Sequence, residues 1–278
     1  MGVTFTELTP EVGVEITGVH GHAFVDASVA ADCQAALEAH GAVVYREANL
    51  DDDDLLAFSH LLGRVHVRPR SADSLNPELS IVSLDPNLSL AAGVQPGTFA
   101  WHIDGTTEEF PHKATLLTCR EVSNDGSGDT EFANTYAAYG ALSDSDKAEI
   151  ADVLVEYGFA NEAHRNTPGV SEESLAVWEQ FPQKVRPLVW TRRNGRKSML
   201  LGSTAGQVVG WPHEKGRALL DRLLEWSTQP RFVLRHHWHL GDLVVWDNTG
   251  MLHRALPYEL SSRRLMHRTA LLGDEAVA

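Results

Sequence analysis

The stretch Trp101-His102-Ile103-Asp104 places an imidazole and a carboxylate two positions apart in an apolar setting. If these residues form a strand, alternate side chains point to the same face, so His102 and Asp104 lie side by side. Such a pair can hold a divalent metal ion. A His-x-Asp pair also arises by chance, however, and a histidine more often only packs and forms hydrogen bonds. A third ligand from another strand would favour the metal site.

The C-terminal part of the chain offers that third ligand. An apolar strand ends at Trp246, the polar turn 247–250 follows, and His253 stands on the next strand. With His102 and Asp104 it would form a 2-His-1-carboxylate facial triad. This triad leaves three coordination positions open and is typical of non-haem Fe(II) oxygenases.

Two arginines mark the segment 264–272. The strand period places Arg264, Met266 and Arg268 on one face. Burying a guanidinium is costly unless it meets an anion, and its planar fork pairs bidentately with a carboxylate or sulfonate. The two arginines therefore indicate either structural salt bridges to Asp or Glu, or the binding of an anionic ligand. The strand alone leaves both open.

Composition limits the possible partners. The chain has 278 residues, of which 43% are hydrophobic, and its formal net charge is −15. Such an acidic protein is not expected to bind nucleic acid or an anionic membrane surface. Cys33 and Cys119 indicate neither a disulfide framework nor a structural zinc site. Without a signal peptide or a membrane-spanning run in the sequence, we expect a cytoplasmic protein.

Apolar periodicity and turn residues predict mostly strands. The expected strands cover residues 12–19, 42–45, 81–84, 114–119, 130–132, 232–238, 243–246 and 265–271, with two more around the Asn194-Gly195 turn. The expected helices cover residues 29–40, the segment after the acidic run 51–54, residues 136–157 with a break near Ser143, residues 172–179 and residues 214–227. The acidic run is interpreted as helix capping rather than as a calcium site.

These elements predict the fold class. Strands dominate both ends of the chain, and βαβ alternation is absent from the pattern. We therefore expect a mainly β protein with flanking helices, whose core is an antiparallel double-sheet barrel or jelly roll. We expect one domain over residues 1–278, with an active-site loop at 86–100 and a helical insertion at about 160–185.

The chain resembles the family of taurine and dichlorophenoxyacetate dioxygenases nearly from end to end. The matching segments are 13–19, Trp101-His102-Ile103-Asp104, Gly128-Asp129-Thr130, Gly241-Asp242, Trp246-Asp247-Asn248, His253 and 263–268. The resemblance implies a double-stranded β-helix core and a dioxygenase that uses Fe(II), 2-oxoglutarate and O₂ to hydroxylate a small organic anion, releasing succinate and CO₂. Family members are commonly dimers or tetramers, so it also implies a homo-oligomer.

The resemblance further implies roles for particular residues. His102, Asp104 and His253 would bind iron and act in catalysis. Thr130 and Arg264 would bind the distal carboxylate of 2-oxoglutarate. The residues expected to contact the primary substrate are Arg268, Arg68, Ser71 and Gly105.

Departures from the family pattern bear on the substrate. Arg68 stands where the taurine enzymes have a histidine, and Ser71 stands where they have a tyrosine, so taurine itself is not the expected substrate. A sulfonate, a sulfate ester and an aryloxyalkanoate stay open. The segments 200–226 and 252–255 resemble the phenoxyalkanoate enzymes at least as well. A catalytically silent, metal-binding jelly-roll module is the alternative of another class.

One further histidine cluster could bind metal. His236, His237 and His239 form a His-His-x-His run just before the Gly241-Asp242 turn. We expect a packing or surface role for them, because most histidines have one.

Overall fold

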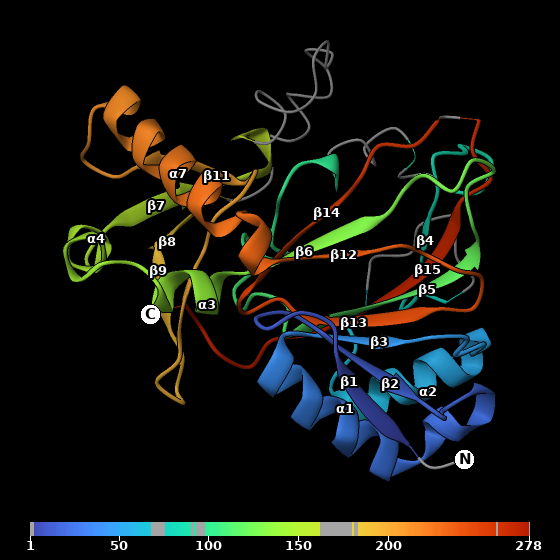
Figure 1. The fold of residues 1–278 in the computed structure, drawn as a ribbon. Coiled ribbons are helices and arrows are strands. Elements are labelled where there is room, and N and C mark those ends of the chain that lie inside the picture. Colours follow the sequence, from blue (N-terminus) through green and yellow to red (C-terminus); the bar gives the residue numbers. More distant parts are fainter. Residues whose placement is uncertain are drawn as a thin grey trace.

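The computed structural model describes residues 3–67, 76–89, 92, 98–161, 180, 183–259 and 261–277. Two sheets of mostly antiparallel strands face each other, and helices lie outside them (Figure 1). The prediction of a mainly β fold with flanking helices is confirmed.

The larger sheet forms one wall of the molecule. Its strands, in spatial order, are β1 (Thr4–Glu7), β2 (Val14–Thr17), β3 (Ala42–Tyr45), β13 (Leu243–Asp247), β5 (Ala114–Glu121), β15 (Leu265–Leu271) and β4 (Ser80–Val82). All neighbours are antiparallel except β2 and β3. The central strand β13 is buried on both faces, which explains its nearly continuous apolar sequence.

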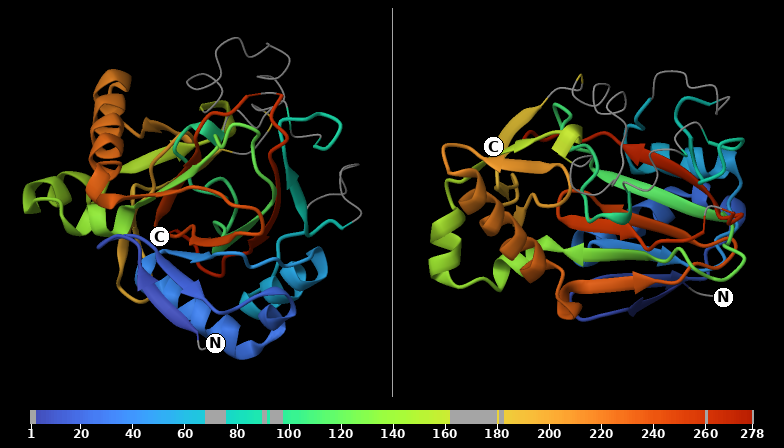
Figure 2. Two further views of the ribbon diagram at one scale, coloured as in Figure 1. Left: turned by 45° about the vertical axis from the view of Figure 1, so that its right-hand side comes forward. Right: turned by 90° about the horizontal axis from the view of Figure 1, so that it is seen from above.

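The smaller sheet forms the opposite wall and contains β12 (Val233–His236), β6 (Thr130–Asn134) and β14 (Met251–Ala255), with β6 in the middle. The inner faces pack together: Val244 and Trp246 of the large sheet belong to the same buried cluster as Phe132 and Leu234 of the small one. Figure 2 shows the two walls from two further directions. The space between them contains the candidate site described below.

Two helices, α1 (Ala27–His40) and α2 (Asp52–Leu62), lie on the outer side of the large sheet (Figures 1 and 2). Alternate residues of β13, Leu243 and Val245, pack under them, and the short helix η1 (Gly21–Val25) completes this layer. Asp51 caps α2 by accepting a hydrogen bond from the Asp54 amide. The interpretation of the acidic run as helix capping is therefore confirmed.

A second group of elements packs beside the two walls. It contains α3 (Thr135–Gly140), α4 (Asp144–Ile150), β7 (Leu154–Tyr157), β8 (Lys184–Pro187), β9 (Val189–Thr191), β10 (Lys197–Met199), β11 (Ala205–Val208), α7 (His213–Ser227) and η3 (Pro230–Phe232). The predicted hairpin at Asn194-Gly195 is confirmed as β9–β10, and Gly195 has a positive φ of 83°.

One element prediction is wrong. Residues 136–157 were expected to be helical with a break near Ser143, but the run ends in β7, whose Leu-Val-Glu-Tyr sequence suits a strand between two others. The stretch 101–104 is not a full strand, because only His102 makes a β-bridge there.

Some predictions fall outside the described residues. Most of the expected loop 86–100 and most of the expected insertion 160–185 do so, as do Arg68 and Ser71. Within the described ranges, no helix combines the length and the apolar character that crossing a membrane requires.

Candidate active site

His102 and His253 are directly opposite each other. The His102 amide donates to the His253 carbonyl at 3.0 Å, and the His253 amide donates back at 2.9 Å. In an antiparallel pair, residues that exchange both hydrogen bonds point their side chains to the same face. The two imidazole rings accordingly lie 4.1 Å apart, centre to centre. This single β-bridge therefore fixes the direction of the His102 side chain, which a strand over 101–104 was expected to do.

Asp104 completes the cluster. Its Oδ2 lies 3.7 Å from Nε2 of His253, and ligand atoms of His102, Asp104 and His253 all lie within 4.8 Å of one another. Nδ1 of His102 bonds the Ala100 carbonyl at 2.8 Å, which leaves its Nε2 for a ligand. The structure thus brings together the three residues that the sequence singled out.

The charge states suit a cation. Burial alone would raise the pKa of Asp104, but the Arg268 guanidinium and the nearby histidines outweigh it and hold that pKa well below its usual range. Burial and the neighbouring His102 lower the pKa of His253 to about 3. At neutral pH the cluster therefore offers an ionised carboxylate and a neutral imidazole, the forms that bind divalent metal ions.

A buried chain of hydrogen bonds orients Asp104. The Thr115 hydroxyl donates to Oδ2 of Asp104 at 2.7 Å and accepts from Nδ2 of Asn248 at 2.8 Å. Oδ1 of Asn248 in turn accepts from the Trp246 indole at 3.0 Å. In the family motif Trp246-Asp247-Asn248, the first and last residues therefore help to orient Asp104 through Thr115. Sequence reasoning missed Thr115, because a threonine in an apolar strand carries no distinguishing signal.

Gly202 supports the backbone of the bridge from the other side. A Cβ at this position would lie 2.5 Å from the Trp101 carbonyl oxygen and 2.9 Å from Cα of His102, and the φ of Gly202 is positive, at 109°. The Ser203 amide also donates to the Trp101 carbonyl at 2.8 Å. Only glycine allows this approach without displacing His102.

The cluster lines a cavity of about 180 Å³. The other lining residues include Leu117, Trp246, Thr130 and Arg264. Thr130 begins β6 and is 4% exposed, while Arg264 precedes β15 and is 3% exposed. Two polar groups that were expected to act together therefore face the same space as the metal-binding donors.

Arg264 is buried without an acidic partner. Its Nε donates to the Gly128 carbonyl at 3.1 Å, and its guanidinium lies over the Tyr258 ring at 4.9 Å. The described residues include no carboxylate in ion-pair contact with it. A Cβ on Gly128 would lie 2.8 Å from Cδ of Arg264, which explains the glycine of the Gly128-Asp129-Thr130 motif. A buried guanidinium without an ion-pair partner favours the binding of an anionic ligand.

Arg268 has a different environment. Its Nη2 donates to Oδ2 of Asp104 at 2.6 Å and lies 3.4 Å from the Thr115 hydroxyl. Both arginines line the cavity, as the strand period predicts, while Met266 between them packs into the core. The sequence left open whether these arginines form salt bridges, and the structure gives one answer for Arg268 and another for Arg264.

The remaining predicted residues are less informative. Arg68 and Ser71 lie outside the described residues. Gly105 is not among the cavity-lining residues. Its φ is 75°, and a Cβ there would lie 2.6 Å from the His112 amide nitrogen, so a tight turn accounts for the glycine.

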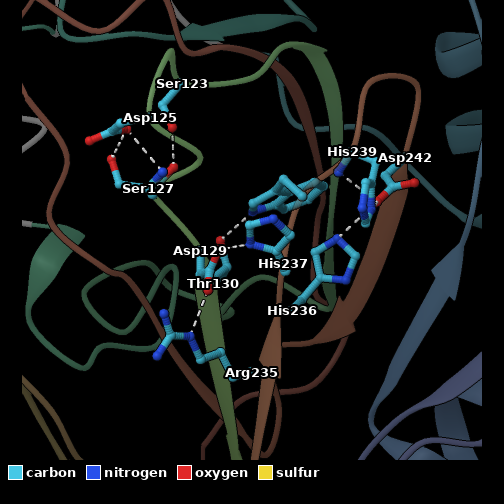
Figure 3. A network of polar contacts seen from close by, with 12 residues as sticks. Ser123, Asp125, Ser127, Asp129, Thr130, Arg235, His236, His237, His239 and Asp242 are labelled. Carbon is cyan, nitrogen blue, oxygen red and sulfur yellow. Dashed lines mark hydrogen bonds and ion pairs between the residues drawn. The ribbon is translucent and has the colours of Figure 1, made fainter.

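The histidine run 236–239 has structural partners. Figure 3 shows His236 and His239 beside Asp242, and His237 beside Asp129. None of these histidines belongs to a metal-binding cluster within the described ranges, which fits the packing role expected for them.

Comparisons with known proteins agree with this geometry. The sequence model described as "Taurine catabolism dioxygenase TauD, TfdA family" matches residues 4–270. The alpha-ketoglutarate-dependent 2,4-dichlorophenoxyacetate dioxygenase of Cupriavidus pinatubonensis (strain JMP 134 / LMG 1197) is 36% identical over 248 residues, which cover 84% of this chain and 85% of that protein. The protein of that name from Burkholderia sp. (strain RASC) is 33% identical over 255 residues, covering 87% and 85%.

A solved structure also matches the whole chain. The crystal structure of AAD-2 in complex with Mn(II) and N-oxalylglycine superposes with a TM-score of 0.82 at 29% identity, and covers 100% of both chains. The predicted jelly-roll core is thereby confirmed. The chain belongs to the TauD, TfdA family of taurine catabolism dioxygenases.

Proposed function

We propose that this chain is an Fe(II)- and 2-oxoglutarate-dependent dioxygenase that hydroxylates a small organic anion and releases succinate and CO₂. One observation carries the proposal: a single cavity is lined both by a metal-binding donor set and by the guanidinium of Arg264, which has no ion-pair partner among the described residues. A keto-diacid has matching ends, because its 2-keto carboxylate can bind a metal while its distal carboxylate meets an arginine.

The donor set fits the proposed metal. His102, Asp104 and His253 would hold Fe(II) and leave three positions open. Bound Fe(II) supplies, with 2-oxoglutarate and O₂, the oxidative chemistry that protein side chains cannot perform. The chain itself would hold the distal carboxylate with Thr130 and Arg264 and exclude water from the cavity.

The same cavity supports a proposal for the substrate class. Apolar and aromatic side chains, including Ile81, Val82, Leu117 and Tyr258, line it beside Arg268. This lining suits an apolar body with one anionic group. We propose an aryloxyalkanoate as the favoured class, supported by the two dichlorophenoxyacetate dioxygenases, while a sulfonate and a sulfate ester are the competing classes.

We propose four residues for the primary substrate. Arg268 lines the cavity and would share its guanidinium between Asp104 and the anionic group of the substrate. Arg68, Ser71 and Gly105 are proposed from the sequence alone. For Arg68, replacement by alanine should raise the substrate KM and leave 2-oxoglutarate turnover without substrate unchanged. Equal loss of both would exclude this role.

A substrate panel tests the function. Succinate release should be stimulated by aryloxyacetates and aryloxypropionates more than by taurine or by alkyl sulfates. Stimulation by taurine or alkyl sulfates alone would overturn the aryloxyalkanoate class and keep the dioxygenase. An absence of succinate with every compound would contradict the dioxygenase itself.

The silent metal-binding module remains the competing proposal. Anaerobic addition of Fe(II) and 2-oxoglutarate should give a weak visible charge-transfer band if the co-substrate chelates the metal. Metal binding without such a band, and without succinate release, would favour the silent module.

We further propose that residues 1–278 form one catalytic unit and that the protein is a cytoplasmic homo-oligomer, a dimer or tetramer, with neither nucleic acid nor membranes as partners. The net charge of −15 supports the exclusion of polyanionic partners. Light scattering after size-exclusion chromatography measures the oligomeric state, and a monomer would contradict this part.

A further inference from the structure

Trp238 contacts Thr130, a cavity-lining residue that is proposed to bind the co-substrate. Its indole Nε1 donates to Oγ1 of Thr130 at 2.9 Å, in a buried hydrogen bond. Strand β12 pairs with β6 so that His236 lies opposite Thr130, and Trp238 follows two residues later. Trp238 is itself only 6% exposed, so solvent does not compete with it for the hydroxyl.

The chemistry of this contact fixes the role of the hydroxyl. A threonine hydroxyl has one proton to donate and two lone pairs, whereas an indole N–H can only donate. Thr130 must therefore be the acceptor toward Trp238, and its own proton points elsewhere. The structure records no acceptor for that proton among the described residues. Since Thr130 lines the cavity together with Arg264, the proton is available to an anion in the cavity.

The same arrangement occurs at Thr115, where the structure contains both the donor to the hydroxyl and the acceptor of its proton. Asn248 donates to the Thr115 hydroxyl, and this hydroxyl donates to Asp104. At Thr115 the carboxylate belongs to the protein. At Thr130 the carboxylate would come from the ligand, and Trp238 takes the place of Asn248.

Neighbouring residues hold the indole in place. The His236 ring packs edge-on against Trp238, with ring centres 4.4 Å apart and an angle of 83° between the planes. Nε2 of His236 lies 3.4 Å from Oδ2 of Asp242. Figure 3 shows His236 between the Asp242 group and Thr130. The orientation of Trp238 therefore rests on a buried polar network outside the cavity.

We propose that Trp238 is a positioning residue for the co-substrate: it occupies a lone pair of Thr130 and so directs the Thr130 proton to the distal carboxylate of 2-oxoglutarate. This inference rests on the proposed function. It assigns Trp238 a role through Thr130, without contact to the ligand.

A double-mutant cycle tests the inference. The dissociation constant of 2-oxoglutarate is measured by anaerobic calorimetry on Mn(II)-loaded wild type, Trp238→Phe, Thr130→Val and the double variant. Losing one buried neutral hydrogen bond should weaken binding about 5-fold in Trp238→Phe, and losing a hydrogen bond to a carboxylate about 30-fold in Thr130→Val. On the Thr130→Val background, Trp238→Phe should change binding less than about 2-fold.

The matched control is Trp226→Phe. The Trp226 indole also donates at 2.9 Å, to the Ala138 carbonyl, but away from the cavity. This control should leave 2-oxoglutarate binding unchanged, and Trp238→Phe should leave the KM of the primary substrate unchanged. If Trp238→Phe weakens binding by the same factor in wild type and on the Thr130→Val background, the indole is merely structural and the inference fails.

A measurement on the metal-free protein needs no substitution of Trp238. The Trp238 indole proton should exchange slowly with solvent in wild type and faster in Thr130→Val, as followed by ¹H–¹⁵N NMR. Equal exchange in both proteins would overturn the inference. Failure of wild type to bind 2-oxoglutarate would instead overturn the proposed function, with the indole result still showing whether the hydrogen bond exists.

Discussion

Two carboxylates in this protein have nearly the same neighbours. Asp104 has Arg268 at 2.6 Å and Nε2 of His253 at 3.7 Å. Asp242 has Arg46 at 2.5 Å and Nε2 of His236 at 3.4 Å. Residue types alone therefore do not distinguish the two clusters.

The difference lies in what completes each cluster. Asp242 also accepts hydrogen bonds from the amides of Glu47 at 3.2 Å and His239 at 3.0 Å, so the protein supplies donors to both oxygens. Asp104 instead faces a cavity, and the structure records no partner for its Oδ1 within the described ranges. The comparison teaches that an opening toward a ligand, rather than the combination His-Asp-Arg, marks the functional site.

The largest expected difference is in metal binding. Replacing a residue outside the direct ligands costs about 10- to 100-fold in metal affinity or activity, so His253→Ala, which removes a proposed ligand, should cost more than about 100-fold. His236→Ala is the matched control, since it removes the equivalent buried imidazole from the Asp242 cluster. Calorimetry with Mn(II) measures both. Equal metal affinity of the two variants would contradict the assignment of the metal site to the Asp104 cluster rather than the Asp242 cluster.

The second effect is on stability, and here the variant of the Asp242 cluster should show the larger change. Asp242→Asn removes the charge that satisfies Arg46 and two backbone amides, and should lower the free energy of unfolding by about 2 kcal/mol. Metal affinity should stay within about 2-fold of wild type. Urea denaturation measures the first quantity. A variant with normal stability and weak metal binding would contradict a structural role for Asp242.

The third effect is smaller and concerns the support of Asp104. Thr115→Val keeps the shape of the side chain but removes the hydroxyl that donates to Oδ2, and should weaken metal binding about 10-fold. Thr118→Val, on the same strand and equally buried, serves as the control. Steady-state activity at limiting Fe(II) also reports the change, and indistinguishable Thr115 and Thr118 variants would contradict it.

The smallest effect is a pH dependence. Burial would raise the pKa of Asp242, but hydrogen bonds from His236 and the His239 amide, with the Arg46 charge, lower it from 3.8 to about 2. A lowered carboxyl pKa stabilises the fold above the unfolded-state value, and this contribution disappears as the pH falls through about 2. Between pH 4 and 2, wild type should therefore lose more stability than Asp242→Asn. If the stabilities of wild type and Asp242→Asn fell in parallel with pH, the lowered pKa of Asp242 would be contradicted.

Much of this architecture could be predicted from the sequence because local patterns carry it. The apolar run of β13, the Asn194-Gly195 hairpin and the helix expected at 29–40 depend on nearby residues only. The metal-binding triad was found because its spacing and the family motifs point to it. Strand β7 was missed because a helical pattern before it was extended past Ile150, although Val153, Val155 and Tyr157 favour a strand.

The rest depends on tertiary register, which local patterns do not encode. The pairing of Arg268 with Asp104 requires β15 to align with β5, where Arg268 lies opposite Leu117. The hydrogen bonds from Asn248 to Thr115 and from Trp238 to Thr130 likewise join segments that are distant in the sequence. No residue in those segments is unusual in isolation, so only the folded arrangement reveals their roles.

The most direct test is a structure determined with Mn(II) and N-oxalylglycine, an unreactive analogue of 2-oxoglutarate. Anomalous scattering should place one Mn(II) between His102, Asp104 and His253, with the distal carboxylate of the analogue against Arg264 and Thr130. A metal bound at Asp242, or an analogue that binds away from Arg264, would contradict the account.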